Sequence, residues 1–158
     1  MTTSLDWYPW YEEVLEELSA TIADADVEWA TDGNRTPWII LGQKRPSGID
    51  HPHAMVLSFS HQRDDVESSR RNELIRISTD IGVMVKQDPQ TPQENLLTTL
   101  EAMAAVETAL YDDRSLKGTV DYLVIQQADA FELESNIGRE LVGNIQIELT
   151  KQADQPRP

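Results

Sequence analysis

The sequence predicts a single α+β domain, with two main helices packed on one face of a mostly antiparallel sheet. Two separate segments carry apolar residues at helical spacing, and several others alternate apolar and polar residues. The predicted order is a helix, four strands, a helix and two strands, and strands that follow one another in runs favour antiparallel pairing. With 158 residues, the chain has the length of one domain. We expect this domain to span residues 1–150, followed by a flexible polar tail at 151–158.

The first helix is expected at residues 5–24, where large apolar residues recur every three or four positions. They are Trp7, Trp10, Val14, Leu18 and Ile22. Two short strands are then expected at 27–30 and 38–41, on either side of a turn-rich tetrad at 31–34.

A long hairpin should follow. Residues 54–60 read as one strand, and alternation from Ile75 to Lys86 indicates a longer, half-buried partner. Residues 62–72 between them are nearly all polar and are expected to form a charged tip.

The second helix has the clearest start. In Thr91-Pro92-Gln93-Glu94, threonine takes the N-cap, proline the first position and glutamate the third, which predicts a capping box. The helix should end at Asp112-Asp113. Its expected apolar stripe comprises Leu96, Leu97, Leu100, Met103, Ala104 and Leu110.

Two strands complete the domain. Residues 119–127 are apolar on both faces, which predicts a central strand, and residues 143–150 alternate cleanly. The intervening segment 128–136 is expected to be a loop or a short irregular segment.

The charge limits the classes of function. Twenty-eight acidic residues against 13 basic ones give a net charge of −15, which opposes non-specific binding to nucleic acid. Such acidity suits a salt-rich interior, where repulsion is screened, or a surface past which DNA must move, and the sequence leaves both open.

The absence of cysteine excludes disulfides and thiolate sites. The N-terminus lacks the features of a signal peptide and no stretch is long enough for a membrane helix, so we expect no membrane partner.

Nothing in the sequence predicts an enzyme. His51 and His53 flank a proline in a loop, with His61 further on, and no spacing fixes a fourth metal ligand. The adjacent acid pairs Asp64-Asp65 and Asp112-Asp113 are best read as solvated surface in so acidic a chain. No nucleophile elbow, phosphate-binding loop or zinc-binding helix motif occurs. We therefore predict no catalytic residues, no metal and no cofactor.

Three groups of residues are candidates for subunit or partner contacts. The first group lies in the expected tip and comprises Arg63, Asp64, Asp65, Glu67, Arg70 and Arg71. The second group lies in the first helix and comprises Trp7, Tyr8, Trp10 and Tyr11. The third group lies in the segment 128–136 and comprises Phe131, Glu132 and Glu134. Arginine forks can bind carboxylates of a neighbouring subunit, whereas the alternative is a solvated loop that blunts the hairpin. Four aromatics in five positions cannot share one helical face, so some point outward or against another chain. The alternative is a helix that packs on its own sheet and leaves one aromatic edge exposed.

In the order of its elements, the chain resembles the tail terminator (tail completion) proteins of long-tailed viruses, and more broadly the neck proteins of these viruses. The resemblance spans roughly residues 72–150. It lies in the helix at 91–112, the strand in Gly118-Thr119-Val120-Asp121-Tyr122-Leu123-Val124-Ile125, and the closing segment Gly138-Arg139-Glu140-Leu141-Val142-Gly143-Asn144-Ile145-Gln146-Ile147-Glu148-Leu149.

The resemblance implies a structural virion protein, assembled in the host cytoplasm, that forms a hexameric ring on the tail tube. Such a ring ends tube growth and joins the tail to the head connector, with DNA passing through it as cargo, and the acidity would suit a halophilic host. The ring requires a heterologous interface that closes, for which residues 54–85 are the best candidate. Two alternatives stay open: another neck protein (an adaptor or stopper), and an acidic non-viral binding module or nucleic-acid mimic. The number of subunits distinguishes the two classes, because a mimic acts as a monomer or dimer and a terminator as a ring.

Overall fold

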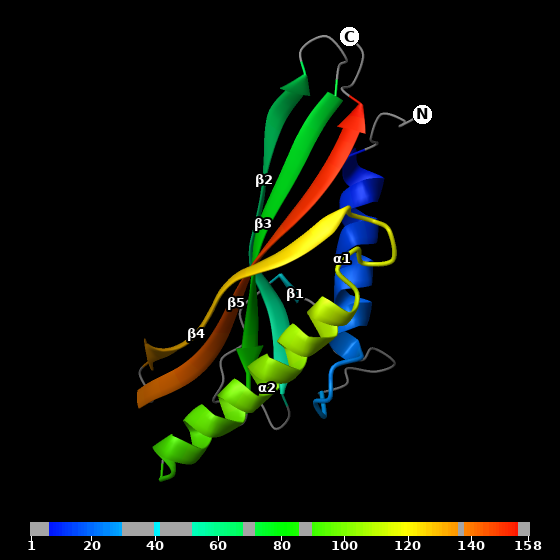
Figure 1. The fold of residues 1–158 in the computed structure, drawn as a ribbon. Helices are drawn as coiled ribbons and strands as arrows, with labels where there is room; N and C mark the ends of the chain where they lie inside the picture. Colours follow the sequence, from blue (N-terminus) through cyan, green and yellow to red (C-terminus); the bar gives the residue numbers. More distant parts are fainter. Residues whose placement is uncertain are drawn as a thin grey trace.

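The computed structural model describes residues 7–29, 40–41, 52–67, 72–85, 90–135 and 138–154. Its centre is a five-stranded sheet in the order β1-β2-β3-β5-β4. The strands are β1 (Ile40–Leu41), β2 (His53–Glu67), β3 (Asn72–Met84), β4 (Tyr122–Ser135) and β5 (Gly138–Asp154). All neighbours pair antiparallel except β1, which lies parallel to β2. Figure 1 shows a strongly twisted sheet in which the long hairpins β2–β3 and β4–β5 extend toward opposite ends and are joined side by side through β3 and β5.

The two helices α1 (Trp7–Ala23) and α2 (Pro92–Asp112) lie on the same face of this sheet (Figure 1). The expected α+β class, with two helices on one face of a mostly antiparallel sheet, is therefore confirmed. α1 contacts α2, and α2 also packs on β3, β4 and β5. Neither described helix covers the opposite face of the sheet (Figure 1).

The main core lies between the helices and the sheet. The alternation predicted from the sequence places one set of apolar residues on the helical face, namely Ile75, Ile77, Ile81 and Val83 of β3 and Ile145, Ile147 and Leu149 of β5. Burial of each stabilises the fold by roughly 1.5–3 kcal/mol. The fully buried members include Val14, Leu18, Ile22, Ile77, Ile81, Leu110, Leu123, Ile145, Ile147 and Leu149. A smaller cluster of Met55, Met84 and Val142 is buried on the opposite face.

The first part of the chain departs from the expectation. Residues 27–29 form no strand, and Ala30 lies outside the described residues. The second expected short strand is represented by β1, which pairs with β2 at Met55 and Val56 instead of forming a hairpin of its own. Three described strands therefore precede α2, not four. Trp29 explains part of this, since it is buried and its indole Nε1 donates to the carbonyl of Ile22, which turns the chain back onto α1.

The expected polar tip at 62–72 was wrong over most of its length. β2 continues to Glu67 and β3 starts at Asn72, with Gln62 opposite Arg76 and Asp64 opposite Leu74. Residues 68–71 lie outside the described part of the chain. An exposed extension of a hairpin needs no apolar face, so its strands give no alternating signal.

The expected loop at 128–136 was also wrong, whereas the strand expected at 119–127 is confirmed from Tyr122 onward but is not central. Both belong largely to β4, which runs from Tyr122 to Ser135 at the edge of the sheet. A bulge between Ile125 and Gln127 shifts the alternation there, so the pattern no longer continues in phase. β5 extends to Asp154, so residues 151–154 of the expected flexible tail pair with β3. Residues 155–158 lie outside the description.

α2 begins with Pro92 as expected, but the predicted capping box does not form, because the side chain of Thr91 makes no capping hydrogen bond. The predicted apolar stripe was partly wrong. Met103 and Leu110 are buried, together with Thr99, Ala102 and Val106, whereas Leu96, Leu97, Leu100 and Ala104 are exposed. Neither described helix is long and apolar enough to cross a membrane.

Candidate interaction surface at the sheet edges

The outer edge of β4 is the longest open backbone edge among the described strands. β4 pairs with β5 along its length and has no described strand on its other side. Among the described side chains of this strand, Tyr122, Val124 and Phe131 are large, apolar and exposed. An open edge presents unpaired N–H and C=O groups that can bind a further strand. The bulge and the exposed Asp129 and Glu132 are features that limit indiscriminate pairing.

The opposite edge of the sheet is also open over part of its length. β1 accompanies β2 only at Met55 and Val56, and no described strand lies beside β2 from Ser58 to Glu67. The acidic residues Asp64, Asp65 and Glu67 are placed by the backbone on this part of β2. The sheet thus presents two different edges on its two sides, one on β4 and one on the acidic end of β2.

The predicted interface residues are distributed over both edges and α1. Arg63 is exposed on β2, and Phe131 and Glu132 are exposed on β4. Asp64, Asp65, Glu67 and Glu134 are placed only by their backbones on these strands, as Trp7 and Tyr8 are on α1. Arg70 and Arg71 lie outside the described residues.

The aromatic residues of α1 whose side chains are described pack on their own sheet. Trp10 is buried and donates from Nε1 to the carbonyl oxygen of Thr119 at 2.8 Å. Tyr11 meets Phe59 edge to face at 5.5 Å between ring centroids, and its hydroxyl lies 2.5 Å from Nδ1 of His61. Burial raises the pKa of the Tyr11 phenol, and the positive charge of Arg63 partly offsets this rise. For Trp10 and Tyr11 the packing favours a structural role within the subunit.

The connection from α2 to β4 builds a site that the sequence did not indicate. The main-chain N–H of Lys117 donates to the Asp113 carboxylate, and Leu116, Lys117 and Gly118 all have positive φ. This left-handed run, which is uncommon outside glycine, reverses the chain and leads it into β4. As a result Arg114, just after α2, lies beside Tyr122 at the start of β4.

Arg114 is held between two exposed tyrosines. Its guanidinium carbon lies 4.3 Å from the ring centroid of Tyr111 and 5.3 Å from that of Tyr122, and Nη1 donates to the Tyr122 hydroxyl. We call Tyr111, Arg114 and Tyr122 the arginine clamp. Tyr111 and Arg114 are three residues apart at the end of α2, a spacing that could have suggested their contact. Tyr122 could not be foreseen, because its approach depends on the left-handed connection.

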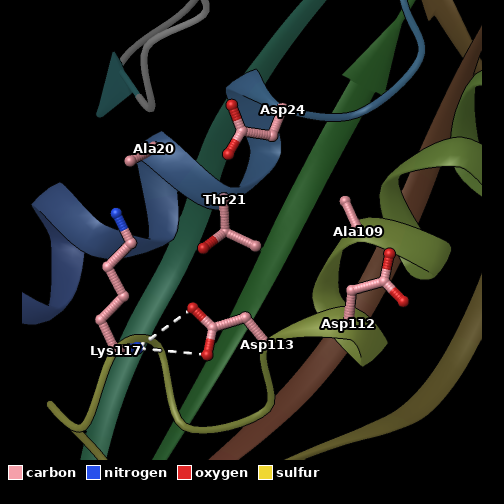
Figure 2. Close-up of a pocket in the computed structure, with 7 residues that line it drawn as sticks. All are labelled: Ala20, Thr21, Asp24, Ala109, Asp112, Asp113 and Lys117. Carbon is pink, nitrogen blue, oxygen red and sulfur yellow. Dashed lines mark hydrogen bonds between the residues drawn. The ribbon is translucent and has the colours of Figure 1, made fainter.

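The hollow between α1 and α2 is a weaker candidate site. It has a volume of about 210 Å³ and is lined by Ala20, Thr21, Asp24, Ala109, Asp112, Asp113 and Lys117, which Figure 2 shows around its mouth. Asp24, Asp112 and Lys117 are exposed, and Asp113 accepts from the main chain of its own turn. Within the described residues, no group of three histidine or acidic side chains could hold a metal ion. The hollow therefore offers solvated charges, with no pair of groups set in contrasting environments.

No family model matches the chain, and no curated protein matches it in sequence.

Proposed function

We propose that this protein is a structural virion protein, a tail terminator that forms a ring at the head-proximal end of a viral tail tube. In this role it ends growth of the tube and joins the tail to the head connector. Its partners are further copies of the chain, the tail tube protein and the connector protein, while DNA passes through the ring without specific binding.

The observation that carries this proposal is the pair of different open edges on opposite sides of one sheet. An edge on β4 that meets the β2 edge of the next copy makes a heterologous contact. Such contacts repeat around a ring when the rotation between copies closes. A contact of β4 with β4 would instead give a two-fold dimer and leave the β2 edges open.

The charge supports the same role. A net charge of −15 lowers the affinity of the surface for phosphate, so that DNA can pass along it. The acidity also opposes assembly at low salt, because copies repel one another unless ions screen them. The ring should therefore be most stable at high ionic strength.

The test is the mass of the purified protein in solution, by light scattering at about 2–3 M and at about 0.1 M salt, conditions between which the screening length changes several-fold. We expect a closed oligomer near six times the 17.9 kDa chain mass, at least at high salt. Addition of assembled tail tubes should then give complexes with the oligomer at one tube end by electron microscopy.

The alternatives give different results. A ring that binds only a connector and not the tube would identify an adaptor or stopper. A protein that remains a monomer or dimer at every salt and concentration, with and without tubes, would overturn the ring and favour an acidic binding module.

A further inference from the structure

We propose that the arginine clamp is the element that recognises the neighbouring subunit, and that it binds the acidic end of β2 of a second copy of this chain. The inference rests on the proposed ring and specifies its interface. Three observations lead to it. Arg114 has no acidic partner within the described residues, the clamp lies at the edge of β4, and the pairing of the sheet places the acidic end of β2 in line with the clamp.

Arg114 is positioned but has no acidic partner within the described residues. Its only described interactions are those with Tyr111 and Tyr122, and no described carboxylate lies within ion-pair distance of it. By contrast, Lys151 pairs with Asp121 at 3.7 Å and Lys117 approaches Glu17 at 4.0 Å. A guanidinium has five N–H donors and no acceptor, so most donors of Arg114 remain available to an anion. Two rings already fix its orientation, which reduces the entropy lost on binding.

The composition of the clamp matches that of a binding hot spot. Tyrosine and arginine are enriched at the energetic centres of interfaces. Tyr111 and Tyr122 are each exposed over more than two fifths of their surface, although each has a large apolar ring. A partner that covers the rings would also remove water from around the guanidinium, which strengthens its hydrogen bonds to a carboxylate.

The clamp stands where an added strand would begin or end. Tyr122 is the first residue of β4, and the open edge of this strand extends from it to Ser135. A strand that pairs with β4 by main-chain hydrogen bonds therefore passes the clamp. Main-chain pairing alone specifies register weakly, whereas a charged contact at one end specifies it strongly.

The pairing of the sheet indicates which segment of a second copy arrives there. One row of the sheet runs across the subunit through Gln62, Arg76, Thr150 and Tyr122. A second copy that continues the sheet at the same level places its own Gln62 beside Tyr122. β2 and β4 run in opposite directions in this sheet, so the new pair is antiparallel.

Acidic residues follow at once along the incoming strand. Asp64 and Asp65 lie two and three residues beyond Gln62 on β2, which brings this acidic stretch level with the clamp. The chain contains 28 acidic residues, so the anionic groups that a second copy presents to Arg114 are carboxylates. A nucleic-acid phosphate has the same charge, but the net charge of −15 repels it.

The first experiment tests the strand pairing by disulfide cross-linking. The chain has no cysteine of its own, so only the introduced cysteines can form disulfides. Ser60 and Val124 share another row of the sheet, two residues along each strand from the first, through Ser78 and Glu148. We expect a mixture of the single variants Ser60→Cys and Val124→Cys to form disulfide-linked pairs on mild oxidation, at high salt. Each variant alone should form few, because the contact joins two different edges.

The second experiment tests the clamp itself. Arg114→Gln should raise the protein concentration needed for assembly by about tenfold or more, as expected when one partner of a desolvated charge pair is removed. It should equally reduce the cross-linked yield. Lys117→Gln is the matched control, since it removes a positive charge three residues away that is exposed, and it should leave assembly unchanged. Arg114→Glu combined with Asp64→Lys and Asp65→Lys should restore assembly that either set of changes alone abolishes.

The outcomes separate this inference from the proposed ring. Assembly of the wild type that Arg114→Gln does not weaken would overturn the clamp and leave the ring standing. Cross-links that form in the single variants would show a two-fold contact instead. A wild type that never assembles or cross-links would overturn both. Retention of the wild type on single-stranded DNA that Arg114→Gln abolishes would assign the clamp to phosphate and overturn the choice of a second copy.

Discussion

The indole Nε1 of Trp10 donates a hydrogen bond to the carbonyl oxygen of Thr119, with 2.8 Å between the two atoms. The two residues are 109 positions apart, and both are buried. The bond fixes α1 to the left-handed connection that leads from α2 into β4. Because Arg114 and Tyr122 lie on either side of Thr119 in the chain, this bond also supports the position of the arginine clamp.

Trp10→Phe should therefore destabilise the fold by about 1–3 kcal/mol, because a buried carbonyl loses its donor. The measurement is the free energy of unfolding from chemical denaturation at high salt. Tyr111→Phe is the control, since it removes a hydroxyl from an exposed side chain and should change stability by less than about 0.5 kcal/mol. Equal stability of Trp10→Phe and the wild type would show that the bond contributes nothing.

Gly143 on β5 lets α2 approach the sheet closely. A Cβ at this position would lie 2.5 Å from Sδ and 2.7 Å from Cγ of Met103, and 3.3 Å from Cγ2 of Thr99. Gly143→Ala should destabilise the fold by about 1–3 kcal/mol through overpacking. Gly82→Ala is a matched control on β3, since the three atoms nearest to its Cβ would all belong to the exposed side chain of Leu57, at 3.1–3.2 Å, which can move aside.

A double-mutant cycle with Met103 tests the cause. Met103→Ala alone should cost about 2–5 kcal/mol through the cavity that it leaves. Combined with Gly143→Ala, the loss should be smaller than the sum of the two single losses, because the new methyl group enters that cavity. Strict additivity in the unfolding free energies would argue against contact between these residues.

The exposed leucines of α2 provide another comparison within one element. Leu110 is fully buried, whereas Leu97 is 58% exposed. Leu110→Ala should destabilise the fold by about 2–5 kcal/mol, and Leu97→Ala should change it by less than about 0.5 kcal/mol. The two variants carry the same substitution in one helix, so their helix propensities cancel. Similar unfolding free energies would mean that Leu97 is covered in solution.

The sequence predicted the features that follow from regular periodicity. Ile75, Ile77 and Ile81 alternate with polar residues, and the structure buries all three because one face of β3 meets the helices. The same rule failed for β4, where Tyr122 and Val124 suggested a central strand. In an edge strand these side chains remain exposed, and exposed apolar residues look the same in sequence as residues of a core.

Tertiary contacts account for what the sequence could not predict. Leu96, Leu97 and Leu100 fit the helical period as well as Met103 does, and the buried face is selected by the packing of α2 on the sheet, where Met103 meets Gly143. The arginine clamp likewise depends on three consecutive residues with positive φ, of which only Gly118 suggests a turn in the sequence. The proposed interface residues on β2 could be named from charge, but their place at an edge required the pairing.

Tyr11 should give the fold a dependence on alkaline pH. Burial raises the pKa of its phenol above the usual 10.0, although the charge of Arg63 lowers it in part. Above pH 10 the unfolded chain therefore releases this proton more readily than the folded chain does. Stability that is fully present below pH 10 should then be lost as the pH rises through the pKa of the folded state.

Tyr11→Phe isolates this effect from other groups that titrate at alkaline pH. The free energy of unfolding should be measured for both proteins between about pH 8 and pH 11, a range that spans the ordinary tyrosine pKa. The variant should be less stable at pH 8, because it lacks the hydroxyl that contacts His61, and the gap should narrow above pH 10. In Arg63→Gln, loss of the positive charge raises the pKa further, so the alkaline loss should continue to a higher pH. A gap between wild type and Tyr11→Phe that stays constant with pH would show that the Tyr11 phenol titrates alike in both states.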